Sequence, residues 1–429
     1  MTAAVLANNL WVIIAGLLVF VMTIAVGFLE VGELGERLNL SLLKTVVMTG
    51  TALVVMGVVG FNTAFAPTLG GIIGNPFYGP GLFLGGLSNQ VSGVWWSQNP
   101  LPGLRLGTYF LFETAFAAVT LALVGVIVLR KMKLGAFFIY SIVYFVLIWN
   151  IPAAWIWNPS GWLAKIGMVD FAGGLVVHGA AGAAGLGIMY AIWRGERRAG
   201  LATSPKVPTE ISPGWLTLGI LLLWVGWFGF NPGSVLAFND EAIVVVLTTF
   251  LAAATAMLST MGTVYLQTRE NPGILYAVNG ILMGLIVITP LAGFVSPGSA
   301  IILGVLAGPL FVIGERFFGR SGWYADPVGL LPGHLLGGLF GVVMIAFFAQ
   351  TAFATGSGFP SLPNGLLFGG GGAAVKQLGI EVLGIIVVVA VIFALSYATA
   401  LAIQTFAGGI RTDDATADLI PLPGGDAAG

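Results

Sequence analysis

The sequence contains no cysteine, which excludes disulfides, thiolate metal ligands and cysteine nucleophiles. It has only two histidines, and no carboxylates stand close enough in sequence to complete a zinc site with them. Charged residues make up 8% of the chain, against ~25% in soluble domains. They form no basic patch suited to nucleic acid. No nucleophile–base pair or cofactor motif is present. The sequence therefore predicts neither an enzyme, a metal or cofactor site, nor a nucleic-acid partner.

Apolar residues are abundant instead: 58% of the 429 residues are hydrophobic, and the mean hydropathy is +1.00. Runs of about 20 apolar residues are long enough to cross a bilayer as helices. The fold class predicted is all-α, a polytopic membrane protein. We expect one membrane domain over 1–408 and a polar, cytoplasmic C-terminal tail over 409–429. Gly, Pro and charged stretches divide the domain into eleven transmembrane helices near 10–29, 43–66, 107–129, 134–156, 171–193, 213–231, 241–267, 273–291, 299–315, 328–353 and 377–407.

The basic residues predict the orientation of these spans. With the N-terminus outside, only Arg105, Lys165 and Lys376 lie on the outer side. Cytoplasmic segments of membrane proteins carry an excess of Lys and Arg, so this asymmetry predicts N-out and C-in. The remaining basic residues all fall on the inner side: Arg37, Lys44, Arg130, Lys131, Lys133, Arg194, Arg197, Arg198, Lys206, Arg269, Arg316, Arg320 and Arg411.

The two histidines lie in matched apolar contexts. His178 follows Asp170 by eight residues, and His334 follows Asp326 by the same spacing. Eight helical residues rise ~12 Å, so both histidines are predicted near the middle of a ~30 Å hydrocarbon layer, on antiparallel helices. This arrangement indicates a 5+5 inverted pseudo-repeat, with the eleventh helix added outside it.

Structural interpretations compete with functional ones at these residues. Each aspartate stands where it can cap a helix N-terminus, and a histidine in a bundle can serve only as an interhelical hydrogen-bond donor. Two neutral imidazoles near the midplane can also pass a hydrogen bond between them and line a path for a small solute. The pair suits a weakly polar molecule, or a cation that loses its proton on entry.

Three motifs resemble the ammonium transporter (Amt/Mep/Rh) family: DFAGGLVVHGAAGAAGLG, WVGWFGFNPGS and the DP-to-His spacing of DPVGLLPGH. The resemblance extends from the first span to about residue 411. It implies that the protein carries ammonium or ammonia and forms a homotrimer with one pore per subunit. It also implies that the protein lies in the lipid bilayer of the plasma membrane (cell inner membrane).

The resemblance also implies residue roles. His178 and His334 correspond to the family's pore-lining histidines, which form a proton relay. Phe116 and Phe230 correspond to the gate above them. The segment NIPAAWIWNPSGW supplies the recruitment tryptophan as Trp157 after a one-residue shift, with Trp155 as the other candidate and Asn158 at the ungapped position. The predicted recruitment residues are Asp170, Phe112, Trp157 and Ser234.

Several positions depart from the family pattern. Gly329 stands where a second aspartate is usual, and Leu335 replaces the glycine after the second histidine. Glu113 is an unusual acid inside a span, where it either faces the pore mouth or pairs with a helix end. The tail lacks much of the family's cytoplasmic motif, which weakens the case for a PII-type regulator that the resemblance would otherwise imply.

The function predicted is transport of ammonium or ammonia through a hydrophobic pore lined by the two histidines. Ammonium is recruited at an outer aromatic site and deprotonated before conduction, because an ion in hydrocarbon is costly. Two alternatives stay open: an ammonium sensor without net transport, and a channel for another neutral gas such as carbon dioxide.

Overall fold

The computed structural model describes residues 2–34, 38–78, 104–128, 131–200, 211–319, 326 and 329–411. Within these, eleven helical stretches are long and apolar enough to span a membrane. This confirms the predicted class, an all-helical polytopic membrane protein. Residues 79–103 and most of the predicted tail, from residue 412 on, lie outside the described residues.

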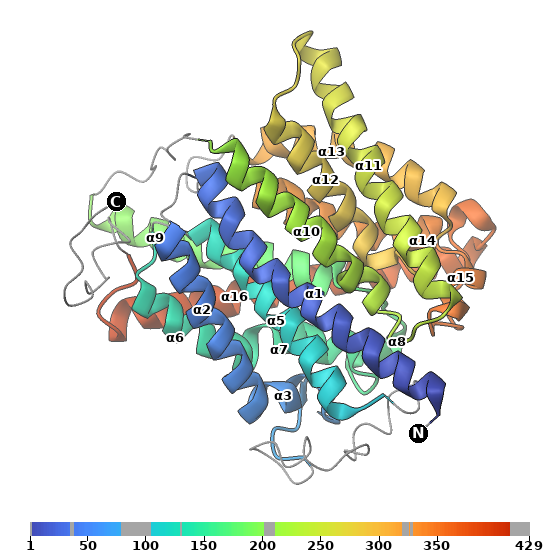
Figure 1. Cartoon of the computed structure of the whole chain (residues 1–429). Coiled ribbons are helices and arrows are strands. Elements are labelled where there is room, and N and C mark those ends of the chain that lie inside the picture. Colours follow the sequence, from blue (N-terminus) through green and yellow to red (C-terminus); the bar gives the residue numbers. More distant parts are fainter. Residues whose placement is uncertain are drawn as a thin grey trace.

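The first five spans are built from several helical elements (Figure 1). A short hairpin, β1 (Thr68–Leu69) and β2 (Ile73–Gly74), follows the second span and was not predicted. The helical elements are α1 (Ala3–Leu34), α2 (Leu38–Val55), η1 (Met56–Gly60), α3 (Phe61–Phe65), α5 (Leu106–Val128), α6 (Leu134–Val143), η3 (Tyr144–Ile148), α7 (Asn150–Pro152), η4 (Ala153–Trp157), α8 (Trp162–Ile166), η5 (Gly174–Gly179) and α9 (Ala180–Arg198).

The other six spans complete the bundle. Predicted and observed spans agree in number and order, while most ends shift by a few residues because caps and glycine turns set them. The elements are α10 (Pro213–Gly233), α11 (Asp240–Thr268), α12 (Ile274–Ile288), η6 (Thr289–Leu291), α13 (Pro297–Phe318), η7 (Leu331–Leu336), α14 (Gly337–Phe348), α15 (Thr351–Gly356), η8 (Leu366–Phe368) and α16 (Gly371–Phe406).

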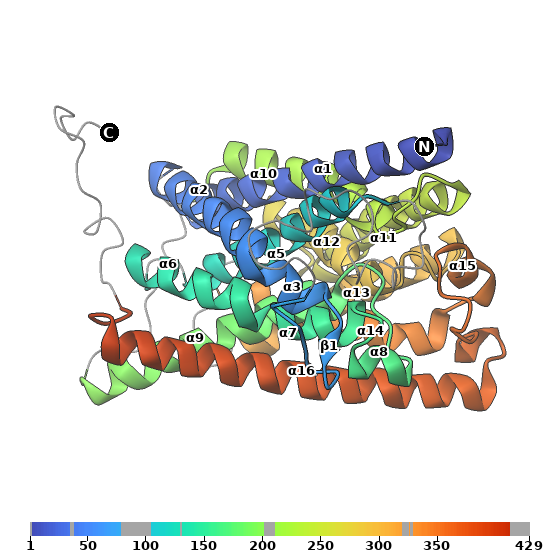
Figure 2. The ribbon, with the colours of Figure 1, turned by 90° about the horizontal axis from the view of Figure 1, so that it is seen from below.

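Helices α1 and α10 pack side by side (Figures 1 and 2). Glycines on α10 make this close approach possible. A Cβ on Gly229 would lie 2.4 Å from the Ala15 carbonyl oxygen, and one on Gly226 would lie 2.2 Å from Met22 Cγ. Small residues let membrane helices approach to backbone contact, where dispersion forces act. These are the first helices of the two predicted repeat halves.

Helices α11, α12 and α13 form a second tightly packed group in the other half of the molecule (Figure 1). Gly284 on α12 and Gly304 on α13 both face the Ala252 region of α11, where an added Cβ would lie 2.3 and 2.6 Å from the Ala252 carbonyl oxygen. The high glycine content of the chain is thus used where three helices meet.

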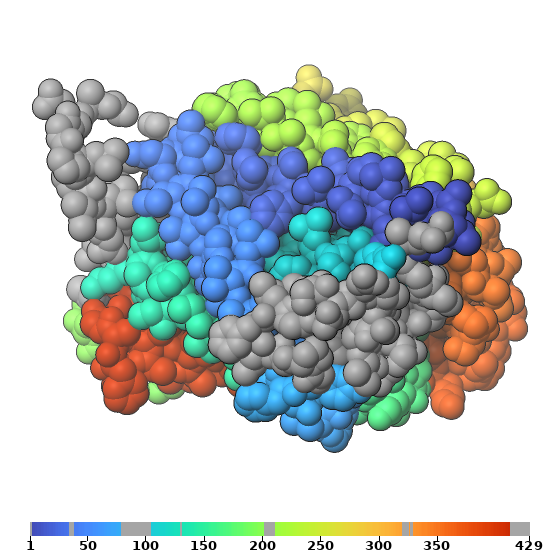
Figure 3. Space-filling model, turned by 60° about the horizontal axis from the view of Figure 1, so that its bottom comes forward, coloured from blue at the N-terminus to red at the C-terminus, as the bar shows by residue number. Residues whose placement is uncertain are grey.

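Helix α16 runs along one side of the molecule, against α9 (Figure 2). At their contact, a Cβ on Gly187 would lie 2.6 Å from the Phe393 carbonyl oxygen. The opposite side is covered by α1 and α2, which occupy much of the surface seen in Figure 3. Most of their exposed side chains are apolar, as a lipid-facing surface requires; they include Leu6, Leu10, Leu17, Val46 and Val54.

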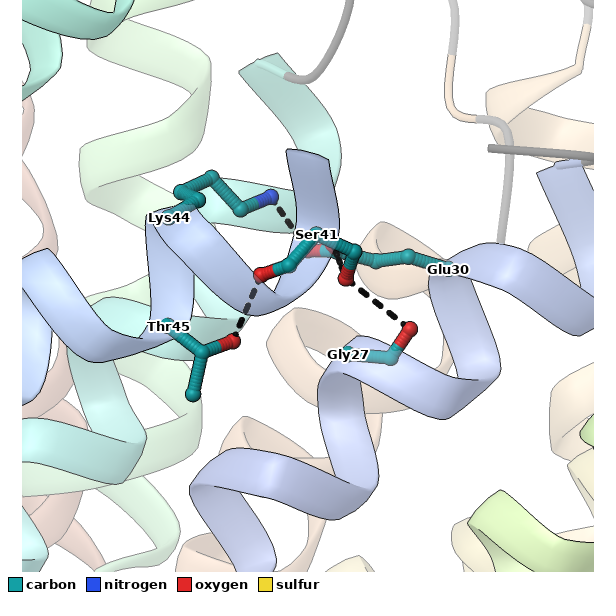
Figure 4. A network of polar contacts seen from close by, with 5 residues as sticks. All are labelled: Gly27, Glu30, Ser41, Lys44 and Thr45. Carbon is teal, nitrogen blue, oxygen red and sulfur yellow. Dashed lines mark hydrogen bonds and ion pairs between the residues drawn. The ribbon is translucent and has the colours of Figure 1, made fainter. Parts of the chain in front are cut away.

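Polar contacts join helix ends at one end of the bundle, which carries Lys44, Lys131 and Arg411 and which we term the basic end. Arg411 and Lys131 both contact Glu196 Oε1, at 3.2 and 3.4 Å. A buried ion pair between Glu30 and Lys44 lies near the α1–α2 junction (Figure 4). The Ser41 hydroxyl is 2.7 Å from Glu30 Oε2. These contacts fix the ends of α1, α9 and α16 to their neighbours.

Candidate functional site

The two histidines meet in the middle of the structure. His178 Nδ1 and His334 Nδ1 are 3.0 Å apart, which is a hydrogen-bond distance. Both side chains are buried, and Nε2 of His178 has no partner among the described residues. The two residues are 156 positions apart in sequence, and they meet because η5 and η7 pack against each other.

Both histidines lie in π-helical turns, and this the sequence did not indicate. His178 belongs to η5 and His334 to η7. Single π-helical turns inserted in α-helices are frequent at functional sites. Pro332 stands in the first turn of η7, where its missing backbone N–H removes no helical hydrogen bond.

Glycines four residues after each histidine bring the two helices together. A Cβ on Gly338 would lie 2.3 Å from the Gly174 carbonyl oxygen and 3.1 Å from His178 Cβ. A Cβ on Gly182 would lie 2.6 Å from Leu335 Cβ. The histidine spacing therefore depends on backbone contact that only glycine permits.

Each aspartate caps the helix that carries its histidine. Asp170 Oδ1 accepts the N–H groups of Gly173 and Gly174 at 2.9 and 2.7 Å. Its Oδ2 accepts those of Leu175 and Val176 at 2.8 and 2.9 Å. Burial raises the pKa of the Asp170 carboxyl, and these four donors act against that rise. The capping interpretation is thus observed.

Asp326 caps the other helix in the same manner. It accepts the N–H groups of Leu330 and Leu331 at 2.9 and 2.8 Å. Gly329 lies between the cap and the helix with φ of +65°, a left-handed conformation that an aspartate would adopt only with strain. The departure at this position therefore fits the local backbone.

Four aromatic rings, those of Phe112, Phe116, Trp157 and Phe230, pack against one another beside the histidines. We call this group the aromatic stack. The Phe116 and Phe230 ring centroids are 4.3 Å apart, and Phe112 lies 4.8 Å from Phe116. Trp157 meets Phe116 edge-on at 5.8 Å. Phe230 in turn stacks on His178 at 5.7 Å with an interplanar angle of 18°. The residues predicted as gate and recruitment aromatics are thus brought together.

The structure separates the three candidates for the recruitment tryptophan. Trp157 donates its indole N–H to the Asp170 carbonyl oxygen at 2.8 Å, which ties it to the aspartate loop. Trp155 donates to the Ile72 carbonyl oxygen and packs against Trp162. Asn158 is buried and donates to the carbonyl oxygens of Ala64 and Ala66. Of the three, Trp157 contacts both Phe116 and Asp170.

Ser234 and Glu113 complete the predicted set. The Ser234 hydroxyl donates to the Phe230 carbonyl oxygen at 2.9 Å, at the end of α10. The neighbouring Gly233 faces the Phe112 ring. Glu113 is buried and hydrogen-bonds Tyr109, one turn before it on α5. This is a pairing that neither sequence interpretation of Glu113 included.

Two functional neighbours were missed at the sequence level. The Trp227 ring stacks on His178 with centroids 5.5 Å apart and an interplanar angle of 20°. Its spacing of three residues from Phe230 could have placed it on the same helix face. Thr289 accepts the Trp227 indole N–H at 3.0 Å, and no sequence signal connects these two residues. Among the described residues, no cluster of ligating side chains could hold a metal ion.

Residues 10–419 match the family model described as the Ammonium Transporter Family. The chain belongs to the ammonium transporter family. It is therefore a multi-pass membrane transporter and not an enzyme. It is 33% identical over 374 residues to "Ammonium transporter Amt1" of Archaeoglobus fulgidus, covering 86% of each chain. The match agrees with the resemblance seen in its motifs.

Solved structures agree with this membership. The fold is similar to that of Saccharomyces cerevisiae Mep2, with 26% identity, a TM-score of 0.81 and coverage of 95% of this chain and 89% of that one. It is also similar to a chain titled "Sensor Amt Protein", with 27% identity, a TM-score of 0.80 and 95% coverage of both chains.

Proposed function

We propose that this ammonium transporter family member takes up ammonium by conducting ammonia through a pore lined by His178 and His334. The observation that carries the proposal is the 3.0 Å contact between the two buried Nδ1 atoms. One imidazole donates in this contact and the other accepts, so a single proton serves the pair. Neither ring needs a positive charge for this contact, and two neutral rings suit a neutral solute.

Recruitment would occur on the far side of the aromatic stack from the histidines. Aromatic faces attract a cation by cation–π interaction, and Phe112, Phe116 and Trp157 supply such faces. The Ser234 oxygen keeps lone pairs that can accept an ammonium N–H. The Phe116–Phe230 contact at 4.3 Å leaves no open path between these two rings, so they act as the gate.

Deprotonation follows from the cost of moving charge into this environment. An ion at the bilayer centre is costly, whereas neutral ammonia carries no net charge to desolvate. Beyond the gate, His178 offers to the entering molecule an Nε2 that has no hydrogen-bond partner among the described residues. We therefore assign the proton loss to the recruitment side and the relay of that proton to the histidine pair. The proton rejoins ammonia on the inner side, so that one charge crosses with each molecule.

We further propose that the N-terminus is outside and the basic end is cytoplasmic, in the plasma membrane. The positive-inside asymmetry supports this orientation. A homotrimer with one pore per subunit fits the proposal, because the histidines and the aromatic stack all come from one chain. A PII-type regulator stays a prediction from the resemblance.

The test is electrical. Wild-type protein in liposomes on a solid-supported membrane is pulsed with ammonium, beside the His178→Ala, His334→Ala variant. We expect a sustained ammonium-specific current that the double variant loses. Equal uptake by both proteins, measured as internal pH change in stopped flow, would refute a role for the histidine pair.

A matched tryptophan pair tests recruitment separately. Trp157→Leu should raise the ammonium concentration needed for half-maximal current, while Trp155→Leu, which removes an indole outside the stack, should not. If the two variants shift that concentration equally, the recruitment site is misassigned.

A second candidate function is ammonium sensing without net transport. The likeness to a chain titled "Sensor Amt Protein" favours keeping it. Saturable ammonium binding by the purified protein, with neither current nor pH change in liposomes, would support the sensor and refute the transporter. A carbon dioxide channel would instead acidify the lumen on a carbon dioxide pulse and ignore ammonium.

A further inference from the structure

The turn η6 (Thr289–Leu291) ends α12 and contacts both histidine-bearing helices. Its Pro290 ring fills space that two glycines leave open: a Cβ on Gly174 would lie 2.5 Å from Pro290 Cβ, and one on Gly341 would lie 2.7 Å from Pro290 Cγ. The Pro290 carbonyl oxygen accepts the Phe171 N–H at 3.0 Å, beside the Asp170 cap. This turn therefore lies between η5, α14 and the segment that carries Asp170.

Thr289 connects the turn to the wall behind His178. Its hydroxyl oxygen accepts the Trp227 indole N–H at 3.0 Å and lies 2.7 Å from the Leu285 carbonyl oxygen. It also lies 3.2 Å from Asn231 Oδ1. A hydroxyl can donate one hydrogen bond and accept two. The Thr289 hydroxyl can therefore accept from Trp227 and at the same time donate to one of these two oxygens.

The network continues into a third helix. Asn231 Nδ2 donates to Thr249 Oγ1 on α11 at 3.1 Å. Thr289, Asn231, Thr249 and Trp227 are all at most 1% exposed. In such a dry setting a lost partner leaves a polar group unsatisfied, so the network holds α10, α11 and η6 in one arrangement.

Trp227 transmits this arrangement to His178. Its ring lies nearly parallel to the imidazole, and Phe230 covers the same histidine at a similar angle. If the indole N–H loses its acceptor, the ring is free to turn. The imidazole then loses the surface that keeps its Nδ1 directed at His334.

We propose that Thr289 is a positioning residue of the pore, which anchors Trp227 and thereby sets the orientation of His178 and the width of the path beside it. This rests on the proposed function and adds to it a determinant of discrimination by size. If the Trp227 ring is no longer held beside His178, the path can widen there. Uptake of the larger methylammonium should then rise relative to uptake of ammonium.

The variants are Thr289→Val, which keeps the side-chain shape and removes the hydroxyl, and Thr289→Ser, which restores the hydroxyl. The matched control is Thr248→Val. Thr248 is equally buried, and its hydroxyl hydrogen-bonds the carbonyl oxygens of Val245 and Ala292. It therefore controls for the loss of a buried hydroxyl that does not accept the Trp227 indole N–H.

Uptake of ammonium and of methylammonium is measured for each variant in liposomes. We expect Thr289→Val to lower ammonium uptake about tenfold, because even a small displacement of functional groups lowers activity strongly. We also expect the ratio of methylammonium uptake to ammonium uptake to rise. Thr289→Ser should restore both values, and Thr248→Val should leave the ratio unchanged. Equal ratios in Thr289→Val and Thr248→Val would overturn the inference.

An experimental structure of Thr289→Val provides a test that does not depend on transport. We expect a changed Trp227 rotamer and a His178–His334 Nδ1 distance beyond hydrogen-bond reach. If both stay as in the wild type, Thr289 does not position the wall, even where uptake has fallen. If the wild-type protein carries no substrate, the proposed function fails while this structural outcome still decides the inference.

Discussion

Replacing Gly338 with alanine should separate the two histidine helices. The new Cβ would lie 2.3 Å from the Gly174 carbonyl oxygen, whereas real Cβ contacts essentially never fall under 3.0 Å. The obstacle is backbone, so no side chain can rotate out of the way. The helices must open by about 0.7 Å, since close-packed interiors transmit such strain.

The consequence for the histidine pair follows from its geometry. An opening of that size along the contact would carry the Nδ1 atoms from 3.0 Å to roughly 3.7 Å, beyond hydrogen-bond reach. Overpacking of this kind costs about 1–3 kcal/mol of stability. The lost contact, worth about 1 kcal/mol, and the displaced rings should together reduce transport by about 10- to 100-fold.

The assay is ammonium-driven pH change in liposomes, with protein amount and thermal unfolding measured in parallel. The matched control is Gly333→Ala, one residue before His334. Among the residues that the structure describes, its Cβ would meet only Ile286 Cδ1, at 3.9 Å, an ordinary van der Waals contact. Alanine also favours helix over glycine by about 1 kcal/mol, so this variant should transport as well as the wild type.

Two outcomes would refute the reasoning. Wild-type transport by Gly338→Ala would mean that the backbone contact does not set the histidine spacing. Equal losses in Gly338→Ala and Gly333→Ala would mean that any change near His334 is harmful, and that the close contact has no special part.

Two further predictions concern buried acids. Lys44→Met should destabilise the protein by about 1–3 kcal/mol, because it removes the ammonium that pairs with the buried Glu30 carboxylate, and adding Glu30→Gln should recover most of that loss; thermal unfolding in detergent measures both, and a double variant no more stable than the single one would contradict the argument. Glu381 accepts from the Val169 N–H at 3.2 Å and from Gln377 at 2.6 Å. Glu381→Gln should therefore keep stability and uptake near wild type, while Glu381→Leu loses about 1–3 kcal/mol; equal stability of these two variants would rule out the acceptor role.

Much of the site could be predicted from motifs, and the rest could not, for a physical reason. His178, His334 and Asp170 stand out because ionisable groups are costly in a membrane and must have a purpose there. The choice among Trp155, Trp157 and Asn158 depended on which side chain the irregular η4 segment turns toward Phe116, and helical periodicity does not describe a π-helical turn. Gly329 was noted as a departure, whereas its positive φ became visible only in the backbone.

The sequence by itself determined the class and number of spans, because every backbone polar group in hydrocarbon must be satisfied within its own helix and this requires long apolar segments. It also determined the matched Asp–His spacings, since they are local. Only the tertiary structure decided the 3.0 Å histidine contact, the aromatic stack and the Thr289 anchor of Trp227. These depend on where glycines let helices far apart in the chain approach, and no local pattern encodes that meeting point.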